Sequence, residues 1–119
     1  MLTIVTLGLA LVLSIAFTGA GYAKVTDQPI MVKARSHLGL SAEVYRAVGM
    51  VELLGALGVL LGVFGLFNWL GLVSALGLMA LMLGALLMHL KAQDTGREFL
   101  PALSMIGLTT LYLTTVVVG

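Results

Sequence analysis

Charged residues and histidines occupy only two windows of the chain, and the stretches outside them are long, apolar and uncharged. The windows run from Lys24 to Glu52 and from His89 to Glu98. An uncharged stretch of about 18 or more mostly apolar residues is long enough to cross the roughly 30 Å hydrocarbon core of a bilayer as a helix. The pattern therefore predicts an integral membrane protein.

The apolar stretches are expected to form four membrane-spanning helices. The first, Met1 to Ala23, lacks a basic residue before its apolar core and exceeds the ~7–15 residues of a signal-peptide core, so we interpret it as a retained helix. As one helix the stretch from Leu53 to Leu90 would be about 57 Å long, nearly two bilayers, so it must fold back. The expected turn is Gly65-Leu66-Phe67-Asn68-Trp69, with a polar Asn and a Trp suited to the membrane interface. The predicted helices of this single domain, residues 1–119, cover about 2–22, 43–65, 69–90 and 99–118.

The first connection, Lys24 to Glu43, is too long for a simple hairpin turn and is expected to contain a short helix of its own. Asp27 can cap this helix, Pro29 is tolerated in its first turn, and Gly39 can end it in a left-handed conformation. Ser41 is the expected cap of the second membrane helix. The predicted fold is an all-α integral membrane protein, an antiparallel four-helix transmembrane bundle with a short interfacial helix in the first loop. That helix would place Lys33 and His37 opposite an apolar face of Ile30, Met31, Ala34 and Leu38.

Basic residues give the expected orientation in the membrane. All six lie on or next to the first and third connections, whereas the second connection and both termini carry none. In an antiparallel bundle the first and third connections share one side of the membrane. The positive-inside rule therefore predicts cytoplasmic first and third loops, with both termini outside.

Composition excludes several classes of protein. Hydrophobic residues make up 61% of the chain and charged residues only 9%, against about a quarter charged in soluble proteins, so no soluble fold could bury this apolar surface. A net charge of +1 argues against a nucleic-acid partner. The chain has no cysteine, which excludes thiol–disulfide chemistry and cysteine-ligated metal centres within it.

Small residues are spaced so that membrane helices can approach closely. They are Gly55, Gly58 and Gly62 on the second membrane helix and Gly77 and Gly84 on the third. Two interpretations remain open for Gly58-x-x-x-Gly62: packing within the chain, or contact between two copies in a homo-oligomer.

Glu52 is the first candidate for chemistry, because it lies two or three turns inside the second membrane helix. An acidic side chain at such depth costs about 2.5–3.5 kcal/mol on insertion scales and usually faces the bundle interior or a wet cavity. Its neighbours three and four residues away on the helix are mostly small and leave space for a partner or a ligand: Val48, Gly49, Gly55 and Ala56. The equal alternative is that Glu52 makes a structural hydrogen bond that fixes the register of the helices.

Three further polar residues are expected near Glu52. Arg46 lies roughly 9 Å away along the same helix but on another face, so it is expected to reach the interface or to pair with Glu43. Lys24 ends the first helix and His89 ends the third on the same side of the membrane. The four residues are expected to converge on one polar pocket under the inner headgroups, where imidazole and carboxylate could relay protons: Lys24, Arg46, Glu52 and His89.

No haem or metal is expected. His37 lies in the loop and His89 at a helix end, so the two histidines are poorly placed to ligate a haem iron. Methionines are scattered through apolar helices, where packing explains them, and no histidine pair has metal-ligand spacing. No redox centre or nucleophile is identified in the chain, so any enzymatic activity would need a partner.

Several segments together resemble the DoxX-like family of small four-helix bacterial membrane proteins. The resemblance spans nearly the whole chain and is most specific around Glu52. It rests on Gly21-Tyr22-Ala23-Lys24, on His37-Leu38-Gly39, on Tyr45-Arg46-Ala47-Val48-Gly49-Met50-Val51-Glu52-Leu53-Leu54-Gly55-Ala56-Leu57-Gly58, on His89 and on Pro101.

The resemblance implies a link to quinone-coupled redox metabolism in a bacterial inner membrane, because relatives include a membrane subunit of a thiosulfate:quinone oxidoreductase. By this analogy Lys24, Arg46, Glu52 and His89 form a polar signature. The implied function is a membrane subunit that binds a quinone or similar apolar redox molecule near the inner leaflet and docks a partner redox protein. The alternative is a non-catalytic accessory protein that stabilises or assembles a larger membrane complex.

Overall fold

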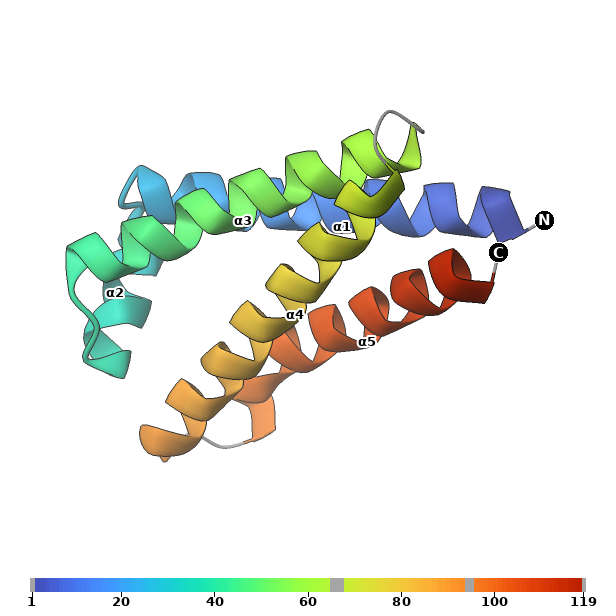
Figure 1. Cartoon of the computed structure of the whole chain (residues 1–119). Helices are drawn as coiled ribbons and strands as arrows, with labels where there is room; N and C mark the ends of the chain where they lie inside the picture. Colours follow the sequence, from blue (N-terminus) through green and yellow to red (C-terminus); the bar gives the residue numbers. More distant parts are fainter. Residues whose placement is uncertain (1, 65–67, 94–95, 119) are drawn as a thin grey trace.

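The computed structural model describes residues 2–64, 68–93 and 96–118, and within these ranges every regular element is a helix. Four helices, namely α1, α3, α4 and α5, are long and apolar enough to cross a membrane. The expected all-α membrane bundle is confirmed. The helices are α1 (Leu2–Val25), α2 (Pro29–Leu38), α3 (Ala42–Val63), α4 (Asn68–Lys91) and α5 (Gly96–Val118) (Figure 1).

Helix boundaries differ from the predicted ones mainly where charged residues begin. α1 continues to Val25, beyond Lys24, and α5 begins at Gly96 rather than at residue 99. The physical reason is that charge marks the edge of the hydrocarbon layer, while the backbone can stay helical beyond it. Asn68 and Trp69, expected in a turn, already belong to α4. The rest of that expected turn, residues 65–67, lies outside the described residues.

The membrane helices form a ring in which each contacts two neighbours. α1 packs on α3 and α5, and α4 packs on α3 and α5, with α1–α3 the most extensive contact. Figure 1 shows both termini at one end of the bundle and α2 at the other, with the α4–α5 pair crossing the α1–α3 pair at an angle. The long dimension is 42 Å, close to the ~40–45 Å of a bilayer with its headgroups. We call the end that carries α2 the loop end.

Helix caps confirm two of the three expected capping residues. The Oγ of Ser41 accepts a hydrogen bond from the backbone N–H of Val44, 3.2 Å away, and so caps α3. Gly39 ends α2 with a left-handed φ of 73°. The expectation for Asp27 was wrong: Gln28 is the N-cap of α2, and Asp27 has a φ of 52°. The Asp27 carboxylate instead accepts hydrogen bonds from Arg46 of α3.

The inside of the ring is filled by apolar side chains from all four membrane helices, while many large apolar side chains on its outside are exposed. Exposed apolar surface of this extent suits contact with lipid tails, which are as apolar as leucine. The chain is therefore a membrane protein whose outer surface contacts the bilayer. Its core cluster consists of Ala10, Leu13, Phe17, Ala56, Val59, Ala75, Leu78, Met82 and Tyr112.

α3 and α4 approach each other through small residues. A Cβ added to Gly62 would lie 2.6 Å from the Cα of Gly71, so the two backbones are in direct contact there. One turn earlier, a Cβ on Gly58 would collide with the hydroxyl of Ser74. Packing within the chain is thus an observed role of Gly58-x-x-x-Gly62.

The other three predicted glycines divide into two groups. A Cβ on Gly55 would lie 2.6 Å from the side chain of Leu78, so this residue also belongs to the α3–α4 contact. A Cβ on Gly77 or Gly84 would meet no described atom within 4 Å. These two α4 residues therefore make no close helix contact among the described residues, and Gly77 borders an open groove between α3 and α4.

We expect Gly62→Ala to destabilise the bundle by about 1–3 kcal/mol, since the added methyl group must push two backbones apart. Thermal unfolding of the detergent-solubilised protein measures this. Gly77→Ala is the matched control: it adds the same methyl group to open space and improves helix propensity, so its melting temperature should equal or exceed that of the wild type. Equal melting temperatures for both variants would contradict the close α3–α4 contact.

Candidate functional site

Glu52 of α3 lies inside the bundle and faces α1. Its side chain is 1% exposed, and its Oε1 lies 2.7 Å from the Nζ of Lys24, the side chain of which is 13% exposed. The expectation that this embedded carboxylate faces the bundle interior is confirmed. Because an ionised group is costly in a medium of low dielectric, the ion pair is the contact that makes Glu52 tolerable there.

Two glycines allow this pair to form. A Cβ on Gly21 would lie 2.7 Å from the carbonyl oxygen of Gly49, and a Cβ on Gly49 would lie 2.8 Å from the Cβ of Lys24. The backbones of α1 and α3 therefore touch at this level. From there the long Lys24 side chain extends toward Glu52. Deeper in the same seam, the hydroxyl of Ser14 donates to the carbonyl of Ala56, 3.2 Å away.

Tyr45 completes the surroundings of the Lys24 ammonium. The Nζ of Lys24 lies 5.5 Å from the centre of the buried Tyr45 ring, within the range of a cation–π interaction. Tyr45 was not among the site residues expected from the sequence. A signal was present, because Tyr45, Gly49 and Glu52 recur at the spacing of one helix face.

Arg46 forms a second ion pair nearer the loop end. Its Nε and Nη2 donate to Oδ2 of Asp27 at 3.1 and 2.9 Å. The expectation that Arg46 reaches the interface alone or pairs with Glu43 was incomplete, since the acceptor is supplied by the turn that follows α1. This pair is more open, with side chains 48% and 32% exposed. Its contribution to stability is accordingly small.

Together the two pairs form what we call the ion-pair ladder: Lys24 and Asp27 from α1 and the turn after it, and Arg46 and Glu52 from α3. Each side contributes one cation and one anion, so the ladder is neutral. The Lys24–Glu52 rung is buried, and the Asp27–Arg46 rung lies toward the loop end. Both pairs join the end of α1 and the turn after it to α3.

The expected convergence of four residues is met in part. The structure brings Lys24 and Glu52 together and places Arg46 on the outer rung with Asp27. His89 is half-buried and lies two residues before the end of α4, on the helix end that the topology directs toward the loop end. Its membership of the same pocket stays a prediction.

The buried Glu52 carboxylate can accept a further hydrogen bond. Oε1 of Glu52 lies 2.7 Å from the Lys24 ammonium, and no other partner of this oxygen is identified among the described residues. A carboxylate oxygen has two lone pairs, so it has room for a second donor. Such an oxygen can accept a hydrogen bond from a ligand hydroxyl group. Within the same described part, no three His, Asp or Glu side chains are grouped to hold a metal ion.

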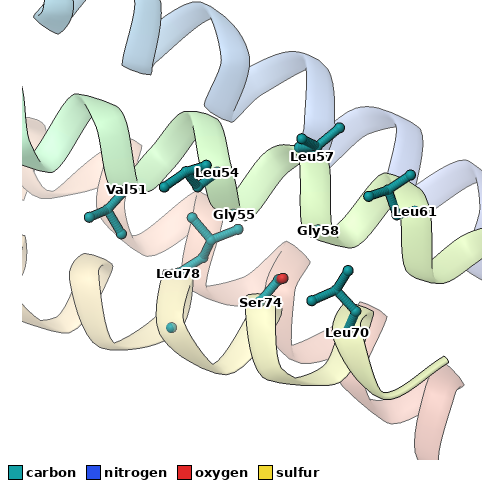
Figure 2. A pocket seen from close by; sticks show the side chains of 10 residues that line it. Val51, Leu54, Gly55, Leu57, Gly58, Leu61, Leu70, Ser74 and Leu78 are labelled. Atoms are coloured by element: carbon teal, nitrogen blue, oxygen red, sulfur yellow. The ribbon is translucent and has the colours of Figure 1, made fainter. Parts of the chain in front are cut away.

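An apolar groove of about 370 Å³ lies on another face of α3, between α3 and α4. It runs within the membrane-spanning parts of both helices and begins at Val51, the neighbour of Glu52. Figure 2 shows Leu78 and Ser74 of α4 lying toward Gly55 and Gly58 of α3, with Ser74 supplying an oxygen among apolar side chains. The groove is suited to a narrow apolar chain.

A comparison with known families decides what kind of membrane protein this is. The sequence profile of the DoxX-like family matches residues 8–116. The chain belongs to the DoxX-like family. The resemblance noted around Glu52 is thus confirmed, and every residue of the ion-pair ladder and of the groove lies in the matched range. No curated protein and no solved structure matches the chain significantly.

In this DoxX-like protein we expect removal of Lys24 to be far more damaging than removal of Arg46. Lys24→Met would leave Glu52 as a buried, unpaired charge, which costs about 3–5 kcal/mol. Arg46→Met removes a partner from an exposed pair, for which about 0–1 kcal/mol is expected. Denaturant titration in detergent measures both values.

The double variant Lys24→Met with Glu52→Gln provides the control for that comparison. It removes both charges together, so most of the lost stability should return. A double variant as unstable as Lys24→Met alone would show that packing of the lysine side chain, and not the unpaired charge, is responsible.

Proposed function

We propose that this DoxX-like protein is a membrane subunit that binds a quinone or a similar apolar redox molecule at the Lys24–Glu52 pair and docks a partner redox protein. The single observation that carries the proposal is the Glu52 carboxylate, which is buried inside the bundle with the Lys24 ammonium 2.7 Å from its Oε1. Intramembrane ionisable residues are functional candidates by default.

The residues present fit such a ligand. A quinone, when bound, would supply a two-electron, two-proton carrier. Lys24 can donate a hydrogen bond to a ring carbonyl, and Glu52 can accept one from a ring hydroxyl, so the pair offers a contact to both forms of the ring. The Tyr45 ring provides an apolar wall that excludes water next to the ammonium.

Proton exchange would run through this chain's own titratable groups. Glu52 is proposed to hold a proton on its carboxylate, and the Asp27–Arg46 pair lies nearer the loop end. His89, at the end of α4, is proposed to exchange protons at the same end of the bundle. Electrons would come from the partner, because nothing identified in the chain can carry them.

The apolar groove supports the membrane half of the proposal. Pockets for apolar ligands are mainly hydrophobic, with a few placed polar groups. Here the polar pair and the groove lie on neighbouring faces of α3, at Glu52 and Val51. We propose that an isoprenoid tail occupies the groove. By the positive-inside rule the loop end would face the cytoplasm of a bacterium, with both termini outside, and the partner would dock there.

The test is retention of quinone by the purified protein in native mass spectrometry, with a ubiquinone and a menaquinone offered separately. We expect Glu52→Gln to lower retention roughly tenfold, because a hydrogen bond to a charged group contributes about 1.5–3 kcal/mol. The matched control is Glu43→Gln, the same change on an exposed residue of the same helix. Equal retention by both variants would contradict a site at Glu52.

A second candidate, a non-catalytic accessory subunit, is favoured by one observation: both rungs of the ladder join the end of α1 to α3 and could serve only to lock these segments. It predicts no quinone retention by the wild type. Glu52→Gln would then lower the melting temperature and the amount of co-purifying protein. Recording ligand mass, partner mass and melting temperature on the same samples separates the two functions.

The groove has a test of its own. Leu54→Trp should fill it, and because Leu54 is 62% exposed the change should leave the fold intact. We expect weaker retention of a long-tailed quinone and unchanged binding of a tail-less analogue. Leu87→Trp is the control, since Leu87 is equally exposed, at 62%, and is not part of the groove. Loss of long-tailed quinone in both variants would argue against a tail in the groove.

A further inference from the structure

α2 has the residue pattern of a helix that lies flat on a membrane. At about 100° per residue, Ile30, Ala34, Leu38 and Met31 fall within an arc of roughly 100°. Cationic residues flank this arc on both edges: Arg35 follows Met31 around the helix, and His37 and Lys33 follow Ile30 on the other side. Such an order lets the cations reach headgroups while the apolar arc points into lipid.

The rest of the protein covers α2 only in part. No residue of α2 is buried, and Ile30 is 71% exposed although it lies outside the membrane-spanning segments. An exposed isoleucine within a membrane span contacts lipid tails. Ile30 lies outside the spans, so its apolar side chain contacts water unless another apolar surface covers it. Ile30 is therefore left open by the described residues, while Met31, Ala34 and Leu38 of the same arc are half-buried.

The connections hold α2 close to the membrane. Three residues separate it from the end of α1, and three separate it from the start of α3. Both of those helix ends are also ends of membrane spans. At about 3.3–3.6 Å per extended residue, each connection reaches roughly 10 Å, so α2 cannot leave the interfacial layer. The nearest apolar medium for the Ile30 side is the leaflet at the loop end.

The charge of α2 indicates which lipids of that leaflet it contacts. From Gln28 to Leu40 the chain carries Lys33, Arg35 and His37 and no acidic residue. Lys33 is exposed and Arg35 is half-buried, and they stand on opposite edges of the apolar arc. Ammonium and guanidinium groups both suit a phosphate oxygen.

We propose that α2 is an interfacial helix that inserts its Ile30 side among acyl chains and binds the phosphates of anionic phospholipids through Lys33 and Arg35. The interaction is independent of quinone binding, because it uses neither the ion-pair ladder nor the groove. Because α2 belongs to the connection between α1 and α3, its contact with anionic lipid also acts on the position of the Asp27–Arg46 pair.

Depth in the membrane tests the first half of the proposal. The chain has no cysteine, so Ile30→Cys and Ser36→Cys can each be spin-labelled at one position in the full-length protein. In nanodiscs containing phosphatidylglycerol, the label at Ile30 should be relaxed by oxygen and shielded from a water-soluble nickel chelate. The label at Ser36, on the opposite side of α2, should show the reverse. Equal nickel accessibility at both positions would overturn insertion.

The same labels distinguish lipid from protein as the occupant. If the Ile30 label is open to nickel in pure lipid nanodiscs and becomes shielded only in native membranes, a protein and not lipid covers α2. That result would also overturn the proposal. Shielding in pure lipid supports it.

Lipid retention tests the second half. Native mass spectrometry should show Lys33→Gln and Arg35→Gln each retaining roughly fivefold less phosphatidylglycerol than the wild type, the factor expected for one cation at an anionic surface. Retention of phosphatidylcholine, which has no net charge, should not change. Lys33→Arg keeps the charge and should retain wild-type binding. Undiminished phosphatidylglycerol in both glutamine variants would overturn the headgroup contact.

Discussion

The ion pair between Lys24 and Glu52 is the constraint around which the bundle is arranged. An ionised carboxylate at this depth needs an opposite charge within a few ångströms, and a lysine on a neighbouring helix reaches it only if the two backbones come close. Gly21 and Gly49 provide that approach. The pair thereby sets both the rotation and the register of α1 against α3, and it determines which residues of α3 are left to face α4 and the lipid.

α3 carries two seams that depend on different physics. Against α1 the contact is polar and electrostatic, with the ion-pair ladder and the Ser14 hydrogen bond. Against α4 it is steric, because Gly58 and Gly62 let α4 come into backbone contact. In a bilayer no hydrophobic force drives helices together, so close packing and polar contacts must do so. The groove between α3 and α4 is lined by leucine side chains with glycines between them, where no side chain fills the space.

The proposed functions rest on the difference between the α1–α3 contact and the α3–α4 contact. The proposed ligand site combines a charged pair on one face of α3 with an apolar groove on the next face. α2 lies over the same end of the bundle and is attached to both helices of the polar seam by short connections. The proposed lipid contacts of α2 and the Asp27–Arg46 pair therefore belong to the same end of the bundle.

The sequence by itself determined the spans, their number, the cap at Ser41, the turn at Gly39 and the inward-facing Glu52. These depend on local composition and on the cost of charge in hydrocarbon, which act on each segment separately. Only the tertiary structure decided that Lys24 is the partner of Glu52, that Arg46 pairs with Asp27, and that Gly77 and Gly84 make no close helix contact. Such choices depend on the rotation of each helix about its axis. In a chain apolar on all sides, helical periodicity carries almost no signal for that rotation.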